Sequence, residues 1–233
     1  MRDELYIVAT IRPWNIASYR DKISLYPGNW HLITKPKDLT VEKIRLLKPK
    51  YIFFPHWSQF VPEEILNSTN CVCFHETDLP YGRGGSPIQN LISKGVRNTV
   101  VTAFKMNEEM DAGPIYLKEN ISLEGLAEEI FIRISEKIAE MIMIIIKNNP
   151  NPIEQEGEAV TFKRRKPNQS EISTEVKNLA ELFDLIRMLD ASEYPKAYFE
   201  DDNFRYEFTR PALRTGNIHA DVVITKLDRG IND

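Results

Sequence analysis

The chain has 233 residues, of which 42% are hydrophobic and 27% charged, and its formal net charge at neutral pH is −4. These values are typical of a chain that buries a substantial core, and they argue against a disordered or fibrous protein. The mildly acidic balance gives no overall attraction for a nucleic-acid backbone and leaves only a local basic patch to consider.

The two cysteines, Cys71 and Cys73, alternate within one apolar segment. Both side chains should therefore lie on one face of a strand, a poor geometry for a disulfide between them. The N-terminal residues are polar rather than signal-like, and the longest apolar run, residues 141–146, is too short to span a bilayer. We therefore expect a reducing, cytoplasmic setting and no membrane partner.

Apolar runs and helical patterns alternate through the first 124 residues. The expected strands are 5–10, 30–34, 51–54, 71–75, 99–104 and 115–121. Helices are expected at 40–48, with Thr40 as N-cap, at 61–66, and at 88–94, where Ser86 would be the N-cap and Pro87 the first helical residue. This alternation predicts an α/β fold with an open, mainly parallel, Rossmann-like sheet and helices on both faces.

A long amphipathic helix is expected next, from Leu126 to Ile145, packed on the sheet. The sequence Asn-Pro-Asn-Pro at 149–152 ends it and divides the chain into a main domain, 1–149, and a small α+β appendage, 150–233. The appendage should contain strands at 159–162, 204–208 and 220–226 and a helix at 179–189. Its alternating strands could pair between subunits, so a homodimer through the C-terminal region is one expectation.

Three features could carry chemistry at one edge of the sheet. His75 ends an apolar strand, a glycine-rich turn at 82–85 follows it, and Asp111 lies beyond the next strand. Open α/β sheets bind ligands at the carboxyl ends of their strands. A neutral imidazole there can take a proton from an amine or hydroxyl, and a carboxylate can orient and stabilise it. The alternatives are a structural histidine, a common Asp-x-Gly turn and a tight glycine turn before a helix.

Two further segments are candidates for binding. Arg12 and Trp14 follow the first strand, where a cation and an indole could hold a phosphate and stack on a base or sugar. The alternative is a polar loop with a core-packing tryptophan. The basic run from Lys163 to Lys166 could bind a diphosphate or tRNA, or could be a solvated surface.

Residues 75–89, together with 110–115, resemble the signature of formyltransferases that use 10-formyltetrahydrofolate. That group includes methionyl-tRNA formyltransferase, the glycinamide ribonucleotide enzyme and the sugar N-formyltransferases. Residues 158–167 resemble the segment after the long helix in the first and third types, and the likeness covers about residues 1–167 in element order. Residues 78–87 are most similar to enzymes that formylate nucleotide-linked amino sugars, such as that of pseudaminic acid biosynthesis.

The resemblance implies that residues 1–149 are the catalytic domain, that 10-formyltetrahydrofolate is the co-substrate and that no metal takes part. The acceptor it implies is the amine of a nucleotide-linked amino sugar. The alternatives are a methionyl-tRNA formyltransferase-like enzyme and a homologue that binds folate or sugar nucleotide without turnover. Acidic side chains between Glu181 and Asp202 would repel a phosphate backbone, which makes nucleic acid the less favoured partner.

The resemblance also assigns site residues. His75 and Asp111 match the catalytic pair, and Cys73 occupies the position of an asparagine that holds the formyl oxygen. A thiol is a weak donor, so an imidazolium, a backbone N–H or a water would take over that contact; a nucleophilic Cys73 is the less favoured alternative. The residues expected at the folate are Trp57, Gln59, Met106, Glu109 and Met110. Those expected at the acceptor are Arg12, Trp14, Tyr81, Arg83 and Lys163.

Overall fold

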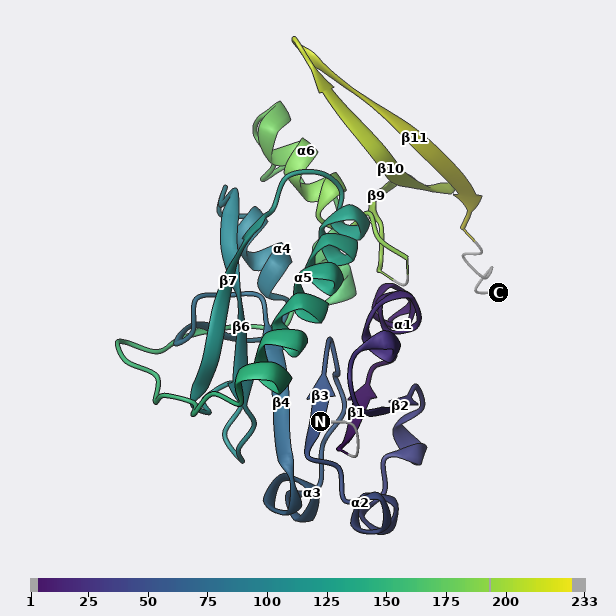
Figure 1. The fold of residues 1–233 in the computed structure, drawn as a ribbon. Helices are drawn as coiled ribbons and strands as arrows, with labels where there is room; N and C mark the ends of the chain where they lie inside the picture. Colours follow the sequence, from purple (N-terminus) through teal and green to yellow (C-terminus); the bar gives the residue numbers. More distant parts are fainter. Residues whose placement is uncertain (1–3, 193, 228–233) are drawn as a thin grey trace.

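The computed structural model describes residues 4–192 and 194–227. Its main sheet has six strands in the order β2-β1-β3-β4-β6-β7 (Figure 1). The strands are β1 (Leu5–Ala9), β2 (Asn29–Ile33), β3 (Tyr51–Phe54), β4 (Asn70–His75), β6 (Asn98–Lys105) and β7 (Ile115–Ser122). Strands β1 to β4 are parallel neighbours, whereas β6 is antiparallel to both β4 and β7. The expected open, mainly parallel α/β sheet is confirmed, with an antiparallel edge that the periodicity could not reveal.

Helices cover both faces of this sheet (Figure 1). They are α1 (Pro13–Asp21), α2 (Val41–Leu47), α3 (Glu63–Ser68), α4 (Pro87–Ile92), α5 (Ala127–Asn148) and α6 (Leu179–Arg187), with short 3-10 turns at Ile23–Leu25, Pro36–Asp38 and Pro167–Ser170. Thr40 caps α2 as predicted, since its Oγ1 accepts the Lys43 N–H at 3.2 Å. Within the described residues, no helix is both long and apolar enough to cross a membrane.

Two expectations about helices are wrong. The segment after β1 is not a loop: Arg12 is the N-cap residue of α1, and Pro13 provides a favoured first helical residue. Ser86 does precede α4, but it lies in the left-handed region at φ 53° and its side chain does not cap the helix. Its Oγ instead accepts the backbone N–H of Arg165 at 3.2 Å, which ties the residues after the long helix to the glycine-rich turn.

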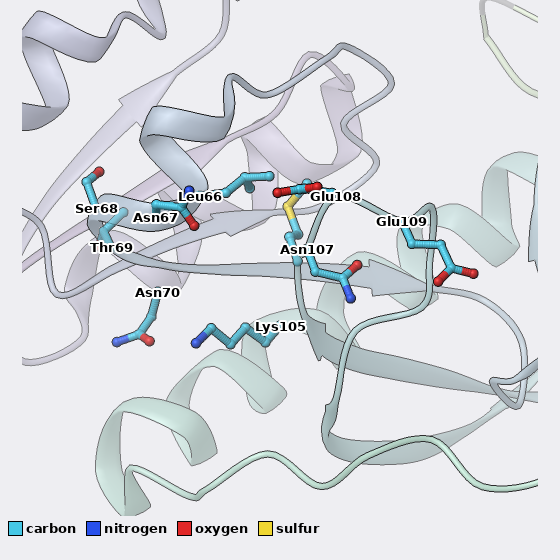
Figure 2. A pocket seen from close by; sticks show the side chains of 10 residues that line it. Leu66, Asn67, Ser68, Thr69, Asn70, Lys105, Asn107, Glu108 and Glu109 are labelled. Atoms are coloured by element: carbon cyan, nitrogen blue, oxygen red, sulfur yellow. The ribbon is translucent and has the colours of Figure 1, made fainter.

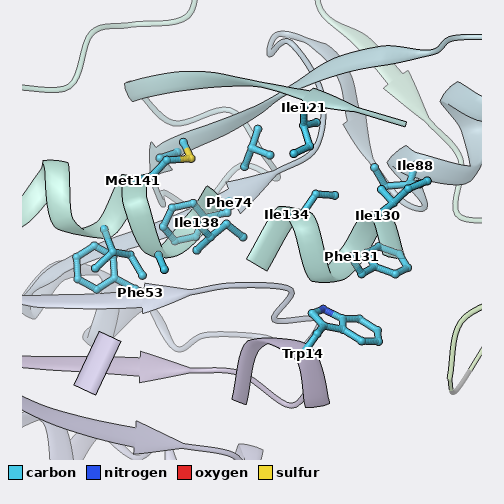
Figure 3. Close-up of a cluster of buried hydrophobic side chains, with 14 of the residues drawn as sticks. Trp14, Phe53, Phe74, Ile88, Ile121, Ile130, Phe131, Ile134, Ile138 and Met141 are labelled. Atoms are coloured by element: carbon cyan, nitrogen blue, oxygen red, sulfur yellow. The ribbon is translucent and has the colours of Figure 1, made fainter. Parts of the chain in front are cut away.

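The apolar stripe of α5 packs on one face of the sheet. Figure 3 shows Ile130, Ile134 and Ile138 of α5 among the sheet residues Phe53 and Phe74. All five side chains are buried, and each stabilises the fold by about 1.5–3 kcal/mol relative to an exposed position. The predicted packing of this helix is confirmed, and it begins at Ala127 with Leu126 as its N-cap residue.

The segments after α5 add two small sheets. Strand β8 (Val160–Phe162) pairs in parallel with β5 (Tyr81–Gly84), so the glycine-rich turn is itself an edge strand. Strands β9 (Ala197–Glu200), β10 (Phe204–Arg214) and β11 (Asn217–Lys226) form an antiparallel sheet. Buried residues after α5 share the core of the main sheet: Phe162, Ile186, Met188, Leu189 and Ala197. A division near residue 150 is still a proposal; it coincides with the end of α5.

Candidate active site

His75 and Asp111 lie together at the carboxyl end of β4. The His75 Nε2 atom is 2.7 Å from the carbonyl oxygen of Gly82, and Nδ1 is 3.7 Å from Asp111 Oδ2. A carbonyl oxygen can only accept, so Nε2 carries the proton of the neutral ring and Nδ1 keeps its lone pair. The basic nitrogen of His75 therefore faces the Asp111 carboxylate, with both side chains largely buried at 8% and 16% exposure.

The backbone around Asp111 is held in an uncommon conformation. Asp111 has φ 53°, in the left-handed region, and its Oδ2 accepts the Gly84 N–H at 2.8 Å. The Gln155 side chain donates to the carbonyl oxygens of Asp111 and Gly113 at 2.8 and 2.9 Å. Gly113 is required there, because a Cβ would lie 1.7 Å from the Lys105 carbonyl oxygen. The sequence did not identify Gln155 as a site residue, because it lies beyond the expected domain boundary near residue 150 and belongs to no recognisable motif.

Cys73 lies two residues before His75 on β4. Its Sγ contacts the carbonyl oxygens of Phe54 and Phe74 at 3.7 and 3.9 Å. Burial, together with the charges of Asp111 and Glu76, raises the pKa of this thiol well above its usual range. A thiol in this environment stays protonated at neutral pH, which disfavours a nucleophilic role.

The residues expected at the folate lie on two loops. Trp57 and Gln59 follow β3, where Trp57 packs on Phe54 with ring centroids 6.0 Å apart and Gln59 is exposed. The indole Nε1 of Trp57 is buried and has no hydrogen-bond partner among the described residues. Met106, Glu109 and Met110 follow β6, and Met110 is 72% exposed.

One open cavity touches only part of this set. It has a volume of about 730 Å³ and is lined by residues 66–70 and 105–109, which include Met106 and Glu109 (Figure 2). It opens at the first residues of β4, whereas His75 is the last residue of that strand. We therefore place the candidate site by the His75–Asp111 contact and not by cavity size.

The residues expected at the acceptor are not brought together in one cluster. Trp14 is 5% exposed and stacks on Phe131 at 4.8 Å with nearly parallel rings, so it forms a wall of the core. The Arg12 guanidinium lies 5.9 Å from the Trp14 ring and 5.7 Å from the Tyr194 ring. Arg12 therefore lies near two aromatic rings just after β1.

The other three expected acceptor residues lie around β5. Arg83 binds the loops on either side of Asp111: it contacts Glu109 at 3.1 Å and Gln155 at 2.8 Å. Tyr81 is partly exposed and packs edge-on against Phe162, and Lys163 is exposed. Arg83 thus has a structural link to the site, whereas no described contact ties Lys163 to it.

A second buried histidine–carboxylate pair lies next to His75. The Nδ1 atom of His56 is 2.8 Å from Asn15 Nδ2 and 3.3 Å from Trp14 Nε1, and its Nε2 is 2.9 Å from Glu76 Oε1. The sequence places His56 at the end of the third strand and Glu76 beside His75, but pairing them needed the parallel contact of β3 with β4.

The fold and this site define an open α/β protein in which His75 and Asp111 meet at one edge of the sheet. Residues 30–145 match the family model described as formyl transferase, and residues 167–225 match that of the methionyl-tRNA formyltransferase C-terminal domain. A methionyl-tRNA formyltransferase structure from Clostridium thermocellum is 44% identical, with a TM-score of 0.91 over 96% of this chain and 99% of that one. The chain belongs to the formyl transferase family.

Two further matches are less similar to this chain than that structure. The methionyl-tRNA formyltransferase of Mesoplasma florum is 30% identical over 193 residues, which are 77% of this chain and 59% of that protein. The chain thus spans little more than half the length of the curated relatives it matches. A sugar N-formyltransferase structure from a Shewanella species shares the fold, with 15% identity and a TM-score of 0.69 over 91% of this chain and 98% of that one.

Proposed function

We propose that this chain is an N-formyltransferase that moves a formyl group from 10-formyltetrahydrofolate to a primary amine. The observation that carries the proposal is the orientation of His75, whose Nδ1 lone pair faces Asp111 because Nε2 is held by the Gly82 carbonyl. The amine nitrogen attacks the formyl carbon while His75 takes a proton from it, and Asp111 stabilises the resulting imidazolium. The imidazolium then returns the proton to the departing folate nitrogen.

The co-substrate supplies an activated formyl group, and the two loops beside β4 have the character of a folate site. Trp57, Met106 and Met110 offer apolar surface to a flat ring system. The unpartnered Trp57 Nε1–H offers a donor that a polar ring or carboxylate of the ligand can satisfy. Gln59 and Glu109 are polar groups at the exposed ends of the same loops.

The oxyanion that forms during transfer needs a donor other than the Cys73 thiol. That thiol is protonated and already directed at backbone carbonyl oxygens. The protonated His75 ring is a charged donor two residues along the same face of β4 from Cys73, which occupies the position of the missing asparagine. We propose that His75 first acts as the base that accepts the proton of the amine and then, once protonated, stabilises the oxyanion.

The relatives favour the α-amino group of methionyl-tRNA as the acceptor. Both the 44% identical structure and the matching C-terminal model carry the methionyl-tRNA formyltransferase name, whereas the sugar N-formyltransferases are similar only in fold. A nucleotide-linked amino sugar, of the kind found in pseudaminic acid synthesis, is the second candidate. One observation favours it: residues 167–227 contain more acidic than basic side chains, which disfavours contact with an RNA backbone.

A direct assay tests the proposal. The protein is incubated with 10-formyltetrahydrofolate and either methionyl-tRNA or a panel of nucleotide-linked amino sugars, and products are analysed by mass spectrometry. Addition of one formyl group to methionyl-tRNA alone would support the first acceptor, and addition to one sugar nucleotide alone would support the second. Absence of formyl transfer to every acceptor by a folded protein would overturn the proposed function.

A further inference from the structure

Glu76 and His56 form a buried pair that the formyl-transfer mechanism above does not use. Glu76 follows His75 directly, and its carboxylate is 7% exposed, nearly the same as the 8% of the His75 side chain. His56 follows β3 and has φ 49°, in the left-handed region. An ionisable pair held in a strained backbone beside the proton-transfer residues indicates a functional position.

The contacts of His56 fix which nitrogen carries its proton. Asn15 Nδ2 donates to the carbonyl oxygen of Pro55 at 3.3 Å, which fixes the orientation of this amide and directs its second N–H at His56 Nδ1, 2.8 Å away. The indole N–H of Trp14 points at the same Nδ1 at 3.3 Å, and an indole can only donate. Nδ1 is therefore an acceptor, and the neutral ring carries its proton on Nε2, towards Glu76.

The pair consequently keeps the negative charge of Glu76. Burial alone raises the pKa of Glu76, but the neighbouring His56 and His75 outweigh it, so its pKa is lowered and the carboxyl is ionised at neutral pH. Although His56 Nε2 is 2.9 Å from Glu76 Oε1, its N–H is not aligned for a hydrogen bond. Among the described residues, no lysine or arginine forms an ion pair with Glu76. Glu76 thus keeps a buried negative charge whose described neighbours are histidine rings, and a bound cation would stabilise that charge further.

Glu76 lies between His75 and the start of α1. His56, its neighbour, is bound to Trp14 and Asn15 at the start of α1, and the Glu76 charge also acts on Tyr194, which packs beside Arg12. The titratable groups near Glu76 are thus His56, His75, Cys73 and Tyr194. One loop expected to hold folate begins at Trp57, directly after His56, and the other carries Met106 and Met110 after β6, so Glu76 lies close to the formyl donor as well as to His75.

We propose that Glu76, oriented by neutral His56, binds the ammonium group of the acceptor and holds it beside His75. This inference rests on the proposed function, and it holds for either acceptor, because an α-amino group and a sugar amine are both partly protonated near neutral pH. The ammonium loses one proton to solvent, the resulting amine attacks the formyl carbon while its second proton passes to Nδ1 of His75, and the imidazolium gives that proton to the departing folate nitrogen. With the product formamide and tetrahydrofolate released, one proton has passed to solvent for each ammonium consumed.

Kinetics of Glu76→Gln at two pH values tests this role, because glutamine keeps the shape and removes the charge. Methionyl-tRNA and a nucleotide-linked 4-amino sugar serve as probes, at about pH 6.5 and about pH 9, on either side of the amine pKa. At the lower pH we expect the KM for the acceptor to rise about tenfold and the KM for 10-formyltetrahydrofolate to stay unchanged. At the higher pH the loss should shrink, because a neutral amine gains nothing from the carboxylate.

Two further variants complete the test. Glu64→Gln, which neutralises an exposed carboxylate on α3, should leave both KM values unchanged. Glu76→Asp keeps the charge and should retain the parent pH dependence even if its kcat is lower, which provides a folded comparison should the glutamine variant be unstable. An active parent with an unaffected Glu76→Gln variant, or a loss equal at both pH values, would overturn the role of Glu76 and leave the proposed function standing. A parent that formylates neither probe would overturn both.

Discussion

At the scale of single residues, the candidate site depends on two histidines whose protons are fixed by neighbours that can only accept or only donate. Gly82 places the proton of His75 on Nε2, and Trp14 with Asn15 places that of His56 on Nε2 as well. The unprotonated nitrogens of the two rings have different surroundings: His75 Nδ1 faces the Asp111 carboxylate, whereas His56 Nδ1 accepts hydrogen bonds from Trp14 and Asn15. Only His75 has a lone pair available for proton transfer.

His75→Ala and Asp111→Asn should each lower kcat by about 10²- to 10⁴-fold, the contribution typical of proton-transfer groups, with little change in melting temperature. Single-turnover formyl transfer and thermal unfolding measure the two effects. His31→Ala and Asp21→Asn, at exposed positions, are the matched controls and should retain parent rates. A folded His75→Ala or Asp111→Asn variant with a parent-like rate would show that the pair does not carry the chemistry.

Cys73 gives a prediction about pH. Its folded-state pKa is raised by burial from the usual 9.0, whereas the unfolded thiol ionises near that value. Above about pH 9 the unfolded thiol ionises while the folded one stays protonated, so the free energy of unfolding is unaffected below that pH and falls as the pH rises. The loss amounts to about 2 kcal/mol at about pH 10.5. Denaturant unfolding at about pH 7 and pH 10.5 should show this extra loss for the parent but not for Cys73→Ala. The same slope in both proteins would contradict a buried, protonated thiol.

At the scale of secondary-structure elements, the short β5–β8 pairing connects the glycine-rich segment to the chain beyond α5. Gly84 has φ +98°, and its N–H binds the Asp111 carboxylate. A Cβ on Gly84 would lie 2.5 Å from the Phe162 carbonyl oxygen, so only glycine allows β5 and β8 to approach this closely.

Gly84→Ala should therefore lower the free energy of unfolding by about 1–3 kcal/mol more than Gly95→Ala, and should also lower kcat. Gly95 is the matched control, because it too has a positive φ, +75°, but nothing lies within 4 Å of the added Cβ. Urea unfolding of both variants and their rates of formyl transfer provide the measurement. Equal destabilisation by the two substitutions would mean that the β5–β8 approach contributes nothing beyond backbone strain.

At the scale of the whole molecule, the β10–β11 hairpin extends from the body of the chain (Figure 1). In the described sheet, β11 pairs with β10 on one side and is the edge on the other. Val222, Val223 and Ile224 of this strand are all exposed. An edge strand with exposed β-branched apolar residues pairs readily with another strand, and an antiparallel pairing of β11 with its own copy would give each of the three residues a cross-strand neighbour.

We predict a homodimer through β11, which light scattering coupled to gel filtration would detect as twice the chain mass. Ile224→Lys should give a monomer. Its melting temperature should fall only by the amount that the dimer contact contributes, because the fold of the subunit is unchanged. Leu46→Lys, at an exposed apolar position on α2, is the control and should stay dimeric. A parent protein that runs as a monomer at micromolar concentration would refute the prediction.

The sequence alone located the strands of the main sheet within a residue or two and placed His75 and Asp111 near strand ends, because apolar periodicity and turn residues act locally. It missed α1 because Arg12-Pro13-Trp14-Asn15 reads as a polar turn, and it missed β5 because two of the four residues of that strand are glycines. The position of Trp14 shows the limit: an indole next to an arginine suggests a ligand contact, but its ring stacks on Phe131 of a helix more than a hundred residues away.

The sequence by itself determined the class of fold, the family resemblance and the candidate proton-transfer residues, since each depends on a short motif or on local periodicity. Only the tertiary structure decided the chemistry those residues can perform. The Gly82 carbonyl fixes the free nitrogen of His75, Gly84 and Gln155 hold Asp111, and the adjacency of β3 and β4 brings His56 to Glu76. Hydrogen-bond partners and burial come from residues distant in the chain, and these contacts set protonation and charge.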